Sequence, residues 1–215
     1  MEFPALQVAL DLTSWRDAEA IVSRLSGLFG PRLLLEAGTP LIKAEGISVV
    51  SRISEMAKGS PVVADLKTMD TAELEVSLAA GAGADAAVVS GAAPPETVAA
   101  FIGECRRRGI ASFVDSIGMS DPSALAEKAK GADVIVIHRG IDEERSRRGR
   151  SWSLIGYFKE RGFRVAVAGG MDLAAAREAL ESGADVIVVG RDITRSQDPW
   201  ARAREYLEML GSAPR

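Results

Sequence analysis

One stretch of the chain sets the pattern on which the rest is built: Val62-Val63-Ala64-Asp65-Leu66-Lys67-Thr68-Met69-Asp70. It begins as a short apolar β-type run and ends in three charged residues. Side chains alternate along a strand, so Asp65 and Lys67 share one face, and Asp70 follows near the start of the next helix. Two unit charges ~4 Å apart interact by about 4 kcal/mol near a protein surface, so each fixes the ionisation of the other. Such a cluster is either a surface salt bridge or part of a reactive site.

Similar apolar runs recur along the whole sequence, and each is followed by a helical pattern. The expected strands are Leu6–Leu10, Leu33–Leu35, Pro61–Ala64, Ala86–Val89, Ala111–Val114, Val134–Ile137, Arg164–Ala168 and Val186–Val189. The expected helices are Asp17–Leu28, Ile47–Ala57, Thr71–Ala80, Glu96–Arg107, Pro122–Ala129, Trp152–Glu160, Leu173–Glu181 and Trp200–Leu210. Continuously hydrophobic strands are typical of a parallel sheet covered on both faces.

The number and spacing of these units indicate the fold class. Eight strands alternate with eight helices, without a linker or a break in composition. The tripeptide Gly-Ala-Asp precedes three of the strands, where glycine ends a helix and a short turn leads into the strand. An open doubly wound sheet is the alternative, but eight evenly spaced units favour closure. We therefore expect a single (β/α)8 barrel domain over residues 1–215.

Composition and charge limit the function classes. The 215 residues are 47% hydrophobic and 26% charged, as in ordinary soluble globular proteins. The net charge of -4 argues against general nucleic-acid binding. We expect no signal peptide and no membrane-spanning segment, because no apolar run has the required length. The single cysteine, Cys105, excludes an intramolecular disulfide framework and indicates a reducing compartment, so we expect a cytoplasmic protein.

In a barrel of this type the residues that follow the strands form the active face. Every expected strand is followed by polar residues or glycine: Asp11, Glu36, Asp65, Lys67, Asp70, Ser90, Gly91, Asp115, Ser116, His138, Arg139, Gly169, Gly170, Gly190 and Arg191. The residues before these positions are almost all apolar. Structural needs alone rarely produce such a pattern, so we expect a catalytic or binding site at this rim.

The last two strands indicate a phosphate site. Gly169-Gly170 and Gly190-Arg191 follow them, where barrels frequently hold a phosphate. Glycine lets backbone N–H groups approach an anion, and an arginine adds a forked contact. A simple tight turn is the alternative reading of the glycine pair. The basic segment Arg139–Arg150 is either a lid that closes over a phosphorylated substrate or a solvated charged loop.

Two further features suggest chemistry at the rim. His138 is the only histidine, and its ordinary pKa suits proton transfer at neutral pH. Lone histidines are often structural, but this one ends an apolar strand beside the carboxylates. Glu36 and Asp65 together form a two-carboxylate site for a hard divalent cation, Mg2+ or Mn2+, unless Glu36 is only a cap or a salt-bridge partner.

The chain resembles the 3-hexulose-6-phosphate synthase family of the orotidine 5′-monophosphate decarboxylase suprafamily. The similar segments are Leu6–Leu12, Glu36–Gly46, Val63–Asp70, His138–Glu143 and Val165–Gly170. The resemblance runs essentially from end to end. It implies a (β/α)8 barrel that works as a homodimer, with the carboxylate of Asp70 contributed to the site of the partner subunit.

The resemblance implies an Mg2+-dependent aldehyde-lyase that joins formaldehyde to D-ribulose 5-phosphate, or cleaves the product, through an enediolate. Glu36 and Asp65 would bind the metal, and His138 would remove a proton. Lys67 would stabilise negative charge, and Asp11 would orient a substrate hydroxyl. Gly169, Gly170, Gly190 and Arg191 would hold the phosphate of the pentulose or hexulose substrate.

Related activities are separated at a few positions. Orotidine monophosphate decarboxylases carry lysine where Glu36 stands. The 3-keto-gulonate-6-phosphate decarboxylases carry a second arginine where Ile141 stands, whereas His138-Arg139-Gly140-Ile141-Asp142 fits the synthases. Arg139 and the sequence Gly190-Arg191-Asp192 are more similar to the decarboxylases. A decarboxylase of a sugar-phosphate keto acid and a non-catalytic sugar-phosphate binder are the alternative functions.

Overall fold

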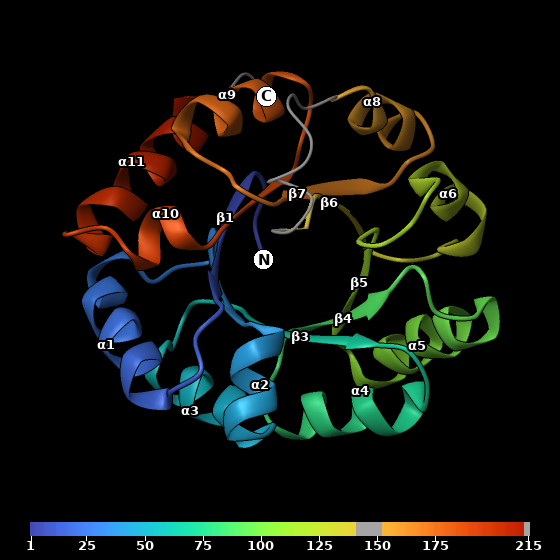
Figure 1. Cartoon of the computed structure of the whole chain (residues 1–215), viewed down its shortest axis with the longest axis horizontal. Helices are drawn as coiled ribbons and strands as arrows, with labels where there is room; N and C mark the ends of the chain where they lie inside the picture. Colours follow the sequence, from blue (N-terminus) through green and yellow to red (C-terminus); the bar gives the residue numbers. More distant parts are fainter. Residues whose placement is uncertain (141–151, 213–215) are drawn as a thin grey trace.

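The computed structural model describes residues 1–140 and 152–212 and has the expected (β/α)8 architecture. All neighbouring strands are parallel and form one closed barrel in chain order (Figure 1). The strands are β1 (Ala5–Leu10), β2 (Leu33–Ala37), β3 (Val62–Thr68), β4 (Ala86–Ser90), β5 (Ala111–Asp115), β6 (Val134–His138), β7 (Arg164–Ala168) and β8 (Val186–Val189). Closure is made by β1 and β8, which pair from Ala5↔Val186 to Val8↔Val189. This pairing excludes the open sheet.

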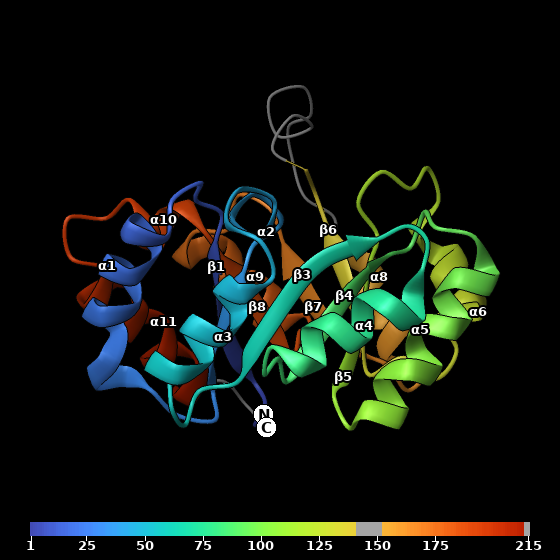
Figure 2. The same ribbon diagram turned by 90° about the horizontal axis from the view of Figure 1, so that it is seen from below.

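Helices surround the barrel on its outer face (Figures 1 and 2). They are α1 (Trp15–Leu25), α2 (Thr39–Glu45), α3 (Ser48–Met56), α4 (Ala72–Gly81), α5 (Pro95–Arg108), α6 (Leu125–Lys128), α8 (Ser153–Lys159), α9 (Leu173–Glu181), α10 (Arg191–Thr194) and α11 (Pro199–Ser212), with 3-10 turns at Ser26–Leu28 and Pro122–Ala124. The sequence did not predict α2 and α10. No helix within the described ranges has both the length and the apolar character that a membrane crossing requires.

The strands separate two apolar layers. Alternate residues such as Leu34, Val63 and Phe113 pack inside the barrel. Their neighbours, such as Leu35 and Val62, pack against the helices. This alternation explains why the strands are hydrophobic along their whole length.

The same alternation places the functional candidates. In four strands, an apolar residue that points into the barrel is followed two positions later by a polar residue on the same face. The pairs are Leu34 and Glu36, Val63 and Asp65, Phe113 and Asp115, and Val136 and His138. Each polar residue lies within its strand rather than after it. The predicted strands were therefore too short at their carboxyl ends, because polarity was taken as the end of β structure.

The three Gly-Ala-Asp repeats have a structural role at the opposite end of the barrel. Asp85, Asp133 and Asp185 each accept a hydrogen bond through Oδ2 from a backbone N–H at the start of the preceding strand, at 2.8 Å. Each also donates its own backbone N–H to the carbonyl of the same residue. Each of these aspartates therefore fixes the start of one strand, β3, β5 or β7, with a pair of hydrogen bonds.

Replacing Asp185 with alanine should lower the free energy of unfolding by about 1–3 kcal/mol, because the buried Val165 N–H loses its charged acceptor. Asp185 also accepts from the exposed Lys159, so Lys159→Met is the matched control and should change stability by less than about 1 kcal/mol. Urea unfolding of the two variants measures both effects. Equal losses of stability in the two variants would show that the exposed Lys159–Asp185 ion pair, and not the hydrogen bond from the Val165 N–H, is the stabilising contact.

Candidate active site

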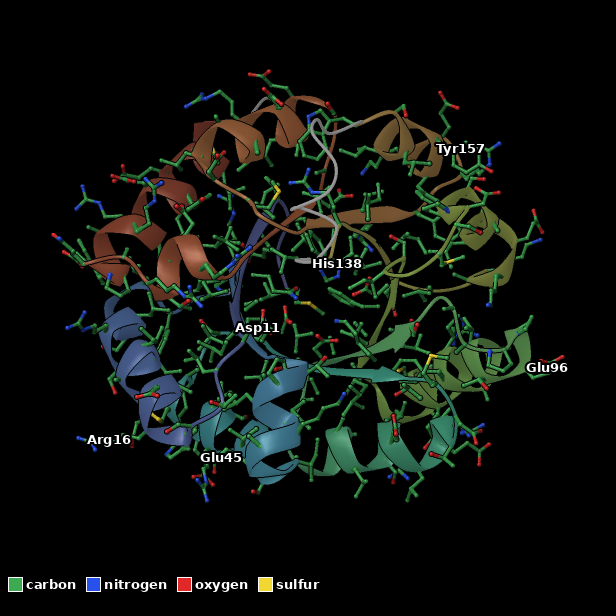
Figure 3. All side chains as sticks on the ribbon, viewed as in Figure 1. Asp11, Arg16, Glu45, Glu96, His138 and Tyr157 are labelled. Carbon is green, nitrogen blue, oxygen red and sulfur yellow. The ribbon has the colours of Figure 1, made fainter. Side chains whose placement is uncertain are left out.

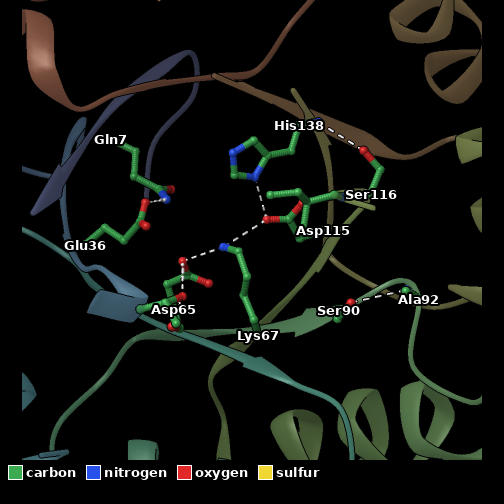
Figure 4. Close-up of polar contacts among 11 residues, drawn as sticks. Gln7, Glu36, Asp65, Lys67, Ser90, Ala92, Asp115, Ser116 and His138 are labelled. Carbon is green, nitrogen blue, oxygen red and sulfur yellow. Dashed lines mark hydrogen bonds and ion pairs between the residues drawn. The ribbon is translucent and has the colours of Figure 1, made fainter. Parts of the chain in front are cut away.

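Lys67 is the centre of a charged cluster in the mouth of the barrel (Figure 4). Its Nζ donates to Asp65 Oδ2 at 2.6 Å and lies 3.2 Å from Asp115 Oδ2. Both carboxylates are nearly inaccessible, whereas the Lys67 side chain is 24% exposed. Burial lowers the pKa of Lys67, but Asp65 and Asp115 outweigh that effect and raise it above its ordinary value. Lys67 is therefore a fixed cation at neutral pH.

The backbone of β3 is distorted to place this cation. The pairing of β3 with β4 shifts between Ala64 and Thr68, and Lys67 has a positive φ of 45°. A left-handed backbone at a residue other than glycine costs about 1–3 kcal/mol and persists only where the surroundings impose it. Such strain is typical of functional positions, and here it accompanies the two ion pairs that hold Lys67 in the mouth.

Asp115 connects Lys67 to the single histidine. His138 Nδ1 lies 2.8 Å from Asp115 Oδ2, the same oxygen that contacts Lys67. Ile117 N–H donates to Asp115 Oδ1 at 2.8 Å, and His138 N–H donates to Ser116 Oγ at 3.0 Å. Burial raises the pKa of Asp115, but the hydrogen bond with His138 and the charge of Lys67 outweigh it and lower this pKa. An ionised Asp115 favours the tautomer that carries a proton on Nδ1 and leaves Nε2 as the base.

Glu36 lies on the other side of the mouth from His138 (Figure 4). Its side chain is buried, and its Oε2 accepts from Gln7 Nε2 at 2.6 Å. Burial raises the pKa of Glu36 well above its ordinary value, and the negative charges of Asp65 and Asp11 raise it further. The surroundings of Glu36 therefore supply too little positive charge to stabilise its ionised form.

Glu36 and Asp65 fit the expected divalent cation. Oδ2 of Asp65 is occupied by Lys67 and by Thr39 Oγ1 at 2.8 Å. Oδ1 of Asp65 is buried and has no hydrogen-bond partner among residues 1–140 and 152–212. Asp65 Oδ1 and the carboxylate of Glu36 would hold such a cation, which would supply the positive charge that offsets their repulsion. Within the described ranges, no group of three or more acidic, histidine or cysteine side chains could hold a metal ion.

Asp11 follows β1 and enters the same mouth. Figure 3 shows Asp11 and His138 near the middle of the barrel, while Glu45 and Glu96 lie at its periphery. A Cβ on Gly38 would collide with Asp11 Oδ1, and one on Gly190 would lie 3.7 Å from Asp11 Oδ2. The residue is exposed, yet the pKa of its carboxyl is raised by desolvation and by Asp65. Asp11 therefore stands between the carboxylate cluster and the end of β8.

The predicted phosphate residues lie at the ends of β7 and β8. Gly169 and Gly170 have positive φ angles of 98° and 54°. A Cβ on Gly169 would overlap the carbonyl oxygen of Arg139, so only glycine fits there. Gly190 precedes α10, and the exposed Arg191 is close enough for its charge to lower the pKa of Asp11. The four residues thus border the same mouth as Asp11.

Asp70 is the predicted site residue that this chain does not bring into the cluster. It is exposed between β3 and α4, and its Oδ1 accepts from Thr71 N–H at 2.8 Å. It borders an open hollow of about 500 Å3 with Leu74 and Glu96. The predicted lid, Arg139–Arg150, falls outside the described residues except for Arg139 and Gly140.

Asp115, Gln7 and Thr39 had no role predicted from the sequence, although they contact four of the candidate residues: Lys67, His138, Glu36 and Asp65. Asp115 was recognisable only as a polar residue at the rim. Gln7 was visible as one polar residue inside the apolar run of β1. Thr39 lies on α2, and its Oγ1 donates to the Asp65 carboxylate and carbonyl. No spacing in the sequence pairs it with Asp65.

Comparison with known proteins assigns this barrel to a family. The model of the orotidine 5′-phosphate decarboxylase / HUMPS family matches residues 4–206. The chain belongs to this family. The match covers all eight strands and every site residue described above, and it confirms the family that the sequence resembled.

Individual members of the family are similar over most of this chain. The bifunctional enzyme Fae/Hps of Methanothrix thermoacetophila is 42% identical over 210 residues, which cover 96% of this chain and 53% of that protein. This chain therefore spans about half the length of the curated relatives it matches. A crystal structure of 3-hexulose-6-phosphate synthase is 33% identical, with a TM-score of 0.87 and coverage of 96% of this chain and 99% of that one. The 3-hexulose-6-phosphate synthase from Salmonella typhimurium is 30% identical, with a TM-score of 0.89 and coverage of 98% and 100%.

Proposed function

We propose that this chain is an aldehyde-lyase of the 3-hexulose-6-phosphate synthase type, which joins formaldehyde to D-ribulose 5-phosphate or cleaves the product. The observation that carries the proposal is the contact series Asp65–Lys67–Asp115–His138 in the mouth of the barrel. It combines a fixed cation with an oriented base. This is the pair of groups needed to remove a proton next to a carbonyl and to stabilise the resulting enediolate.

Each residue has one task in the proposed reaction. His138 removes a proton from C1 of the ketose through Nε2, while Asp115 holds Nδ1. Lys67 stabilises the negative charge that develops on oxygen. C1 then forms the new bond to the formaldehyde carbon, and the proton on His138 neutralises the alkoxide formed from the aldehyde oxygen. Asp11 orients a substrate hydroxyl.

Two further sets of residues bind the other parts of the reacting complex. Glu36 and Asp65 would hold Mg2+ or Mn2+, which supplies electrophilic polarisation of the ketose oxygens and neutralises charge. Support comes from the buried Asp65 Oδ1 and from the raised pKa of Glu36, to which burial contributes most and Asp65 less. The phosphate lies against Gly169, Gly170, Gly190 and Arg191, whose backbone N–H groups and guanidinium suit an anion.

A direct assay tests the function. The purified chain should consume D-ribulose 5-phosphate only when formaldehyde is present, and EDTA should stop the reaction until Mg2+ is restored. Arg191 after Gly190 favours one second candidate, a decarboxylase of 3-keto-gulonate 6-phosphate. Release of carbon dioxide from that substrate, without formaldehyde turnover, would replace the first proposal with the second. Tight binding of ribulose 5-phosphate without either reaction would instead indicate a non-catalytic binder.

The proposed active form is a homodimer in which Asp70 completes the site of the partner subunit. Three of the four exposed large hydrophobic residues in the described ranges lie together in sequence beside Asp70: Met69, Leu74 and Leu78. Exposed apolar groups of this kind are typical of interfaces. We further propose a cytoplasmic setting, supported by the single cysteine, Cys105, which is buried as a free thiol.

Subunit mixing tests the shared site. Asp70→Ala and Lys67→Met dimers should each be nearly inactive, because one lacks the contributed carboxylate and the other the cation. After unfolding and joint refolding, half of the dimers are mixed and each contains one native site, so activity should recover to about a quarter of the wild-type value. Recovery of no activity, with mixed dimers shown to be present by mass spectrometry, would place both residues in the same subunit's site.

A further inference from the structure

A second polar cluster lies behind the end of β8 and plays no part in the reaction proposed above. Asp192 of α10 is held by two residues of α11. Arg202 donates through Nε to Asp192 Oδ2 at 2.8 Å and through Nη2 to Oδ1 at 3.1 Å. Tyr206, which is fully buried, donates its hydroxyl to Asp192 Oδ2 at 2.6 Å. A forked arginine contact with an added phenol hydrogen bond fixes both the position and the plane of the carboxylate.

This cluster is attached to a segment that has little rigidity of its own. The helix α10 has four residues, too few for a stable isolated helix. Its remaining buried attachment is Ile193, which packs in the core between the barrel and the helices. Figure 1 shows α10 between the end of the barrel and α11. The contacts of Asp192 therefore decide how α10 is seated on α11.

The seating of α10 decides where two proposed phosphate ligands lie. Gly190 and Arg191 directly precede Asp192 in sequence, and Gly190 lies beside Asp11 at the mouth. Rotation of a single helical turn by a few tens of degrees would move the Arg191 guanidinium by several ångströms. The neighbouring carboxylate also matters, because an Asp192 turned toward the mouth would repel an anionic substrate. Arg202 and Tyr206 turn it toward α11 instead.

The charge of Asp192 agrees with this arrangement. Burial raises the pKa of Asp192, but the hydrogen bonds from Arg202 and Tyr206 outweigh it and lower this pKa below its ordinary value. The carboxylate is thus ionised at neutral pH and remains attached to the arginine throughout the working range.

We propose that Asp192, held by Arg202 and Tyr206, is a positioning residue that orients Gly190 and Arg191 for recognition of the substrate phosphate. The inference rests on the proposed function only in taking Gly190 and Arg191 as phosphate ligands. Asp192 itself does not touch the substrate. It acts on affinity for the phosphorylated ligand and not on the chemical step.

Two variants and one control test the inference. Asp192→Asn keeps the size of the side chain and removes its charge, and Tyr206→Phe removes one hydrogen bond and keeps the buried ring. The control is Glu208→Gln, which breaks the exposed Arg204–Glu208 ion pair of the same helix without touching α10. For each protein we would measure kcat and KM for D-ribulose 5-phosphate, the dissociation constant of inorganic phosphate by calorimetry, and the melting temperature.

Asp192→Asn should raise KM and the phosphate dissociation constant about tenfold, and Tyr206→Phe about threefold, with kcat within twofold of wild type. Glu208→Gln should change none of these values. Unchanged phosphate binding in both variants, or a fall in kcat at constant KM, would overturn the inference. If Asp192→Asn does not fold, Tyr206→Phe alone decides. If the wild-type chain binds neither inorganic phosphate nor the sugar phosphate, Gly190 and Arg191 are not phosphate ligands and the proposed function itself fails. That result differs from a failure of the Asp192 role alone, in which the wild type binds phosphate and both variants bind it equally well.

Discussion

Lys67→Met should lower kcat for formaldehyde addition by about a thousandfold, or about 4 kcal/mol of transition-state stabilisation, while KM changes much less. The reason is that Lys67 is the cation shared by Asp65 and Asp115, and its charge is fixed by both. Methionine has a similar length and shape but cannot stabilise an enediolate. Steady-state kinetics at saturating Mg2+ provides the measurement.

The matched control for this variant is Lys58→Met, which removes an exposed lysine at the opposite end of the barrel. It should leave kcat unchanged. Circular dichroism verifies folding, because Lys67→Met leaves two buried carboxylates without their cation. A folded Lys67→Met protein with kcat within tenfold of wild type would contradict the role of Lys67.

Glu36→Gln should abolish turnover and yet stabilise the metal-free protein at neutral pH by about 1 kcal/mol, as commonly results when unfavourable interactions at a functional site are removed. Burial and the charges of Asp65 and Asp11 raise the folded-state pKa of Glu36 well above its ordinary value of 4.5. At pH values between 4.5 and the raised folded-state pKa, the folded protein binds more protons than the unfolded protein. Wild-type stability therefore falls as the pH rises through this range. Glutamine keeps an acceptor for Gln7 but does not ionise.

The stability gain therefore has a defined pH dependence. It should be present at pH 7 and should disappear as pH falls toward 4.5, where Glu36 is protonated in both states. Addition of Mg2+ should raise the melting temperature of the wild type and not that of Glu36→Gln, because a ligand that binds only the folded state stabilises it. The control Glu55→Gln, at an exposed position, should follow the wild type. A Glu36→Gln protein that retains the Mg2+ effect would remove Glu36 from the metal site.

The barrel could be predicted because the sequence pattern that produces it occurs eight times. Eight apolar runs at similar spacing, each followed by a helical pattern, leave few alternatives to closure. The carboxyl ends of the strands were less predictable. Asp65 and Lys67 were assigned to a loop, yet they belong to β3, because polar side chains that pair with one another can stand within a strand at the barrel mouth. A polarity rule derived from buried strands fails at that position.

The parts of the site that depend on contacts between different strands could not be predicted from the sequence. Asp115 contacts Lys67 and His138 from a different strand, and nothing in local spacing pairs these residues. The positive φ of Lys67 follows from the shifted pairing of β3 with β4. Short helices such as α2 and α10 carry too few residues to show a helical period.

In the proposed mechanism, His138 and Lys67 generate an enediolate from the ketose, and Glu36 and Asp65 would hold the divalent cation that assists them. Exchange of the C1 protons of D-ribulose 5-phosphate in D2O, followed by proton NMR without formaldehyde, measures that step alone. We expect the wild-type chain with Mg2+ to exchange one C1 proton stereospecifically, and EDTA, Glu36→Gln or Lys67→Met to abolish the exchange. Absence of exchange by the wild-type chain at high concentration with Mg2+, or equal exchange in the presence of EDTA, would contradict this mechanism.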